Sequence, residues 1–177
     1  MGRFTPLAAA ALALSLGAPA DAGPAFDLII DGCNEQLAGE VGIEALNGDL
    51  GQTINVPVTV NTDTDVSAFV LEITVPPGVV NYAGTTAGSL TQSFTLGGNW
   101  FSAQGFVRIS GFGTGTIPAS SVGTLAVISF EVVGAGQGTF GLQSFQDDLG
   151  TYTPCFDNHG SNPVEPDTWG RVKSLYR

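Results

Sequence analysis

The segment from Gly105 to Phe145 limits the possible folds of this chain more than any other stretch. Its apolar residues recur with a period of two in runs at residues 107–109, 125–133 and 140–145, a pattern typical of β-strands. The runs are separated by GTGT with Pro118 and by GAGQG, which form turns and do not begin helices. We expect three antiparallel strands with tight connections, whose apolar face is covered by a second sheet. Nothing in this stretch resembles a catalytic motif, which favours a binding or structural module over an enzyme.

The rest of the chain supplies further strands of the same kind. Apolar residues alternate at 54–60 and at 69–75, a short strand is expected at 26–30, and shorter strands lie between 79 and 104. Pro57 falls within one of these runs, which favours an edge strand or a bulge there. With 177 residues, of which 43% are hydrophobic, the chain can bury one core. We predict an all-β fold, a single β-sandwich with tails.

The first residues predict export. Residues 1–22 contain Arg3, an apolar run from Leu7 to Ala18 and small residues before a cleavage point at Gly23, which is the organisation of a signal peptide. This run is too short to cross a bilayer, and no other stretch approaches about 18 uninterrupted apolar residues. We expect a secreted, extracellular or periplasmic protein without membrane insertion.

The remaining boundaries follow from composition. We expect an N-terminal extension at 23–40, the sandwich at 41–157, a polar linker at 158–167 and a basic tail at 168–177. Asp167 or Thr168 can cap a short helix in the tail, with Trp169 and Val172 near one face.

Charge excludes several classes of partner. The formal net charge is -11, and Arg108 is the only Arg or Lys between Gly23 and Asp167. An acidic body of this kind repels nucleic acid and anionic lipid. We expect no nucleic-acid partner.

Two cysteines in an exported chain most simply form one disulfide. Joining Cys33 to Cys155 closes a loop of about 120 residues, a large restriction of the unfolded chain. The alternative, a metal site with His159 and Asp157, needs a further well-spaced ligand.

The sequence contains few side chains that are suited to catalysis. His159 is the only histidine, and Asp147 and Asp148 are adjacent, so they point apart in an extended chain. We therefore expect no catalytic residues and no cofactor. Asn61, Asp63 and Asp65 form a weak calcium candidate, because hard cations prefer such oxygen ligands, and the alternative for this loop is a plain turn.

The ordered series of segments GQTINVPVTV, VSAFVLEITVPPGVV, GFVRISGFG, VGTLAVISFEVVG and FQDDLG resembles a cohesin domain, over about residues 41–150. The resemblance implies a jelly-roll β-sandwich of about nine strands without catalytic residues. It also implies a module that binds dockerins in cellulosomes, the assemblies that degrade polysaccharides, or in other extracellular assemblies. The expected partner is a dockerin-like or other extracellular protein.

The resemblance also indicates a binding face. Type I cohesins carry an outward Asn and Asp on the strand that resembles residues 68–75, whereas this chain has Ala68 and Val70 there. In the cohesin arrangement, Arg108 lies on a strand of the same sheet. We therefore predict that Ala68, Val70, Glu72 and Arg108 share one exposed binding surface. Arg108 either pairs with Glu72 or offers its charge to a partner.

Two alternatives remain open. Cohesins are related in shape to some carbohydrate-binding modules, so the same sandwich could bind a polysaccharide through Tyr82, Trp100 or Phe101. Because Trp100 and Phe101 are adjacent in a strand, at most one of them faces outward. The other alternative is a purely structural surface component.

Overall fold

The computed structural model describes residues 28–30, 32–33, 36–138 and 140–155. The predicted signal peptide, linker, basic tail and His159 lie outside these residues. Within the described part the chain contains strands and no helix, so no helix there could span a membrane.

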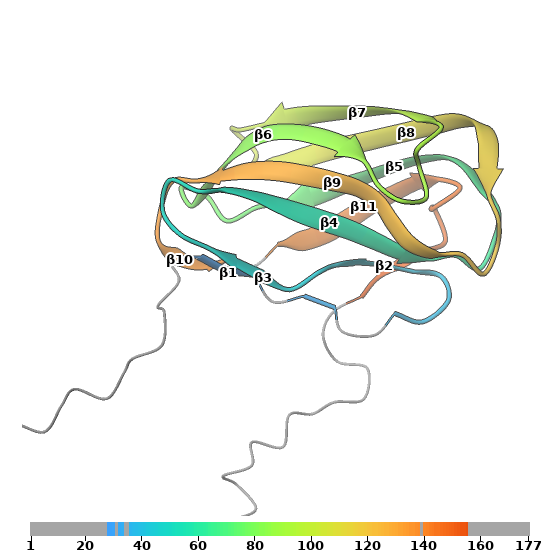
Figure 1. The fold of residues 1–177 in the computed structure, drawn as a ribbon, viewed down its shortest axis with the longest axis horizontal. Helices are drawn as coiled ribbons and strands as arrows, with labels where there is room; N and C mark the ends of the chain where they lie inside the picture. The colour runs from blue at the N-terminus through green and yellow to red at the C-terminus, as the bar shows by residue number, and fades with distance from the viewer. Residues whose placement is uncertain (1–27, 31, 34–35, 139, 156–177) are drawn as a thin grey trace, which may run out of the picture.

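Nine strands form two sheets, and three short segments form a third sheet (Figure 1). The strands are β1 (Leu28–Ile30), β2 (Glu40–Ile43), β3 (Leu46–Gly48), β4 (Thr53–Asn61), β5 (Val66–Thr74), β6 (Val80–Ala87), β7 (Phe94–Phe101), β8 (Phe106–Ile117), β9 (Val122–Val132), β10 (Gly136–Gly138), β11 (Gly141–Asp147) and β12 (Thr153–Pro154). The five-stranded sheet has the order β12-β2-β4-β9-β6, and the four-stranded sheet has the order β11-β5-β8-β7. The predicted all-β, two-sheet sandwich of about nine strands is confirmed.

The alternating residues of the two sheets meet in one core. Phe69, Leu71 and Ile73 of β5 are fully buried, as are Val107 and Ile109 of β8. The five-stranded sheet contributes buried residues from the matching face of its central strands, namely Ile54, Val56, Val58 and Val60 of β4 and Ile128, Phe130 and Val132 of β9. The period of two therefore separates an inner apolar face from an outer face on both sheets.

The predicted strands of residues 105–145 exist, but the expectation that they are neighbours in one sheet is wrong. β8 and β11 belong to the four-stranded sheet, with β5 between them, and β9 belongs to the other sheet. The short link between β8 and β9 carries the chain from one layer to the other, so these two strands do not pair with each other. β8 pairs with β5 and β7, and β9 pairs with β4 and β6. This alternation between layers is the jelly-roll connectivity.

The edge position considered for Pro57 is also wrong. β4 lies between β2 and β9, and Pro57 lies one residue outside the β2 ladder, which ends where Ile43 pairs with Val58. The β4–β9 register shifts between Val58 and Thr59. A central strand accommodates proline here because one neighbour has ended and a bulge begins beside it.

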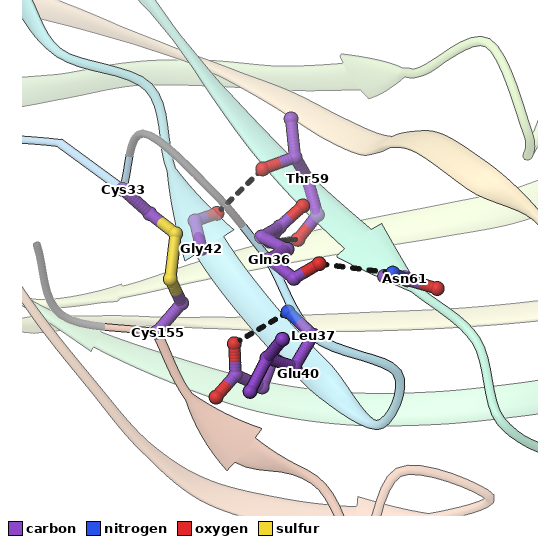
Figure 2. The surroundings of a disulfide bond; sticks show 8 residues. All are labelled: Cys33, Gln36, Leu37, Glu40, Gly42, Thr59, Asn61 and Cys155. Carbon is purple, nitrogen blue, oxygen red and sulfur yellow. Dashed lines mark hydrogen bonds between the residues drawn. A yellow bond between two sulfur atoms is a disulfide. The ribbon is translucent and has the colours of Figure 1, made fainter. Parts of the chain in front are cut away.

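A disulfide joins the two ends of the described domain, as predicted (Figure 2). Cys33 and Cys155 are 122 residues apart in sequence, and their Cα atoms are 5.8 Å apart. The amide of Cys33 donates to the carbonyl of Ile43, and the amide of Cys155 donates to the carbonyl of Val41. Both cysteines are thus fixed against the same strand, β2.

Candidate protein-binding face

The outer face of the four-stranded sheet carries all four residues predicted to bind. Glu72 of β5 pairs with Arg108 of β8, Val70 pairs with Ser110, and Ala68 pairs with Phe112. Phe69, Leu71, Val107 and Ile109 alternate with them along the two strands and are fully buried, so these side chains lie on the face away from the core. The sheet thus brings Ala68, Val70, Glu72 and Arg108 together.

Arg108 and Glu72 form an ion pair at the centre of this face. Nε and Nη2 of Arg108 donate to Oε1 of Glu72 at 2.8 Å and 2.6 Å. The Arg108 side chain is 44% exposed, whereas Glu72 retains 7% of its accessible surface. Glu72 therefore faces outward, as predicted, but is covered rather than exposed.

Two aromatic rings support the Arg108 guanidinium. Phe101 and Phe106 pair across β7 and β8, and their rings stack with centroids 4.6 Å apart. The Cζ atom of Arg108 lies 5.1 Å from the Phe101 centroid and 5.9 Å from the Phe106 centroid, within the range of cation–π attraction. The guanidinium is held by a carboxylate and by an aromatic surface.

Phe112 is a candidate binding residue that the sequence analysis did not select. It is 61% exposed and lies between Ala68 on β5 and Thr95 on β7. With the half-buried Ala68 and Val70 it forms an apolar patch beside the ion pair. The signal was present in the sequence, because Phe112 follows Arg108 by four residues and therefore shares its face in a regular strand.

Asp148 holds the first residues of β5, at one end of this face. Its Oδ2 accepts hydrogen bonds from the amides of Ser67 at 2.6 Å and Ala68 at 2.9 Å. The bond from Ser67, followed by that from Ala68, lowers the pKa of the Asp148 carboxyl below 3.8, while slight burial acts in the opposite direction. The carboxylate thus holds β5 to the loop that follows β11.

We expect Asp148→Ala to lower the free energy of unfolding at pH 7 by about 1 kcal/mol, since the bonds are charge-assisted but exposed to solvent. The pKa of this carboxyl is lower in the folded state than in the unfolded state, so its stabilisation is complete above pH 3.8 and is lost as the pH falls through the folded-state pKa. Urea unfolding of both proteins from pH 7 to pH 2.5 measures this difference. A stability gap that stayed constant or widened at low pH would contradict the assignment.

The other sequence candidates have local structural roles. Nδ2 of Asn61 donates to the Gln36 carbonyl, and Oδ1 of Asp65 accepts from the Ala119 amide. The amide of Asp63 donates to the hydroxyl oxygen of Tyr152. Among the described residues, no group of three or more His, Cys, Asp and Glu side chains is placed to hold a metal ion.

The aromatic residues considered for sugar stacking divide between the two faces. Tyr82 and Trp100 are partly buried against the core, with their rings at a centroid distance of 6.5 Å. Phe101 faces outward against Phe106 and Arg108. At most one member of the Trp100–Phe101 pair thus faces outward, as the strand alternation requires.

Comparison with solved structures shows the same fold. A non-cellulosomal cohesin from the hyperthermophilic archaeon Archaeoglobus fulgidus is 20% identical, with 72% of this chain and 83% of that chain covered and a TM-score of 0.51. The second type II cohesin module of the adaptor ScaA scaffoldin of Acetivibrio cellulolyticus is 21% identical, with coverages of 69% and 80% and a TM-score of 0.50. A type II cohesin domain from the cellulosome of the same organism is 12% identical, with coverages of 71% and 90% and a TM-score of 0.50. No curated protein matches the chain.

The cohesin domain family model matches residues 39–158. This match covers the two sheets and Cys155 of the disulfide. It also includes the segments on which the resemblance was based. The chain belongs to the cohesin domain family.

Proposed function

We propose that this chain is a non-catalytic protein-binding module that captures a dockerin-like partner on the outer face of its four-stranded sheet. Cohesin domains as a family are binding modules of this kind. The observation that carries the proposal is the apolar patch of Ala68, Val70 and Phe112, because an outer sheet face in water ordinarily alternates to polar residues. Exposed apolar patches beside polar groups mark interaction sites.

The placement of the patch supports this function further. It lies on the regular part of β5 and β8, whose pairing runs without a register shift from Ala68 to Thr74. A partner therefore meets a rigid surface, which lowers the entropy lost on binding. We further propose that the protein acts outside the cytoplasm, because residues 1–22 have the organisation of a signal peptide.

Phe112→Ser tests the binding face directly. We expect the dissociation constant for a dockerin that binds the wild-type protein to rise roughly tenfold or more, as for truncation of an interface anchor. The free energy of unfolding should change by less than about 0.5 kcal/mol, because the side chain is exposed. Biolayer interferometry against a panel of dockerins, with thermal melts of each variant, gives both values.

Leu50→Ser is the matched control, because Leu50 is 60% exposed and lies in the β3–β4 turn, away from this face. Equal losses of binding in both variants, or unchanged binding of Phe112→Ser, would contradict the assigned face. Capture of a polysaccharide from a parallel panel, with no dockerin bound, would instead favour the carbohydrate-binding alternative. Charge reversal at Arg108 is a poorer test, since it places a second carboxylate against Glu72.

A further inference from the structure

The Arg108 guanidinium is presented to solvent in a fixed orientation. Nε and Nη2 both donate to the same oxygen of Glu72, and the stacked rings of Phe101 and Phe106 lie under the group. A free arginine side chain loses rotamer entropy when it binds a ligand. Here the surrounding side chains have already restricted it, so a ligand meets a prepared donor group.

The ion pair leaves donors available. In the part of the chain that the structure describes, no hydrogen bond is made by Nη1 of Arg108, and the side chain is 44% exposed. The Glu72 side chain, by contrast, is only 10% exposed. A partner that approaches this point therefore meets guanidinium N–H groups more than carboxylate oxygens, and a planar guanidinium edge matches a carboxylate.

The charges around Arg108 make this position of the face selective for carboxylates. The flanking residues of its cross-strand row are neutral amides, Asn99 on β7 and Gln143 beside Glu72 on β11. Arg108 is the only Arg or Lys among the described residues, on a chain with a net charge of -11. A carboxylate is thus accepted at Arg108 and repelled over most of the body, which would fix the register of a partner.

A second anchor lies at a defined distance on the same strand. Phe112 follows Arg108 by four residues with no register shift against β7, which corresponds to about 13 Å at roughly 3.3 Å per residue. Between them, Ser110 lies between Val70 and Gly97, so the row between the two anchors carries side chains shorter than those of Arg108 and Phe112.

We propose that Arg108 is the specificity-determining residue of this face, and that its partner carries a carboxylate about 13 Å from an apolar side chain that packs on Phe112. The inference rests on the proposed function, because it describes how the same face selects its partner. Glu72, Phe101 and Phe106 act as positioning residues for Arg108.

A phage-displayed library of random peptides tests the inference without a known natural partner. The full-length protein and its Arg108→Gln and Leu50→Ser variants are used as separate baits. We expect peptides selected on the wild type and on Leu50→Ser to be enriched in Asp or Glu together with an apolar residue. Arg108→Gln should lose the acidic enrichment and keep the apolar one.

The affinities of the selected peptides then measure the coupling energy between Arg108 and the carboxylate of the peptide. A wild-type-selected peptide should bind Arg108→Gln about ten- to a hundredfold more weakly, the loss typical of a charge-assisted hydrogen bond. Arg108→Lys, which keeps the charge without the planar fork, should give a smaller loss. Replacing the carboxylate of the peptide by the amide should remove the difference between the baits, as in a double-mutant cycle.

The outcomes separate this inference from the proposed function. Selected peptides without acidic enrichment, or a dockerin that needs Phe112 but binds Arg108→Gln as tightly as the wild type, would overturn the role of Arg108 and leave the binding face intact. Acidic peptides that depend on Arg108 while no dockerin binds would support the role of Arg108 and show that the partner is not a dockerin.

Discussion

Removing the Cys33–Cys155 disulfide is expected to lower the free energy of unfolding by about 5 kcal/mol and the melting temperature by roughly 10–20 °C. The bond closes a loop across 122 residues, so its loss raises the conformational entropy of the unfolded chain, which is no longer held in that loop. It also frees two short elements, β1 with three residues and β12 with two. Differential scanning calorimetry of the protein with and without a phosphine reductant measures the effect.

The Cys33→Ser/Cys155→Ser variant provides the control. The sequence contains only these two cysteines, so the reductant should leave the melting temperature of this variant unchanged. We expect the variant and the reduced wild-type protein to melt at the same temperature. Two free thiols in native protein, or a reduced protein that melts within a degree or two of the oxidised one, would contradict the prediction.

Phe69→Ala should destabilise the domain by about 3–5 kcal/mol, the range for removing a buried aromatic side chain. Phe69 is fully buried, and its ring centroid lies 6.4 Å from that of Phe94. A Cβ atom added to Gly111 would lie 2.5 Å from Cε1 of Phe69, so the ring occupies the space that this glycine leaves open. Alanine would leave a cavity between the sheets.

Phe112→Ala is the matched comparison, because Phe112 lies on the same sheet but on its outer face. The free energy of unfolding of the Phe112→Ala variant should differ from that of the wild type by less than about 0.5 kcal/mol. Urea unfolding followed by intrinsic fluorescence gives both values. Similar losses in the two variants would show that the inner and outer faces of this sheet have been assigned incorrectly.

Local periodicity was enough to predict much of the fold. The alternation in residues 69–75 identified Phe69, Leu71 and Ile73 as the inner face, and all three are buried. The same alternation placed Ala68, Val70 and Glu72 outside. The pairing of Cys33 with Cys155 followed from there being only two cysteines. These inferences succeed because the direction of a strand side chain depends only on its position in the strand.

The sequence by itself thus determined the class of fold, its inner face and the disulfide, while the tertiary structure decided which strands are neighbours. Periodicity cannot show that β8 and β9 belong to different sheets, or that β4 is central despite Pro57. The covering of Glu72 by Arg108 and the exposure of Phe112 likewise depend on the register of β5 against β8. That register is set by the packing of the whole core between strands distant in sequence, and a one-residue slip would move every side chain to the opposite face.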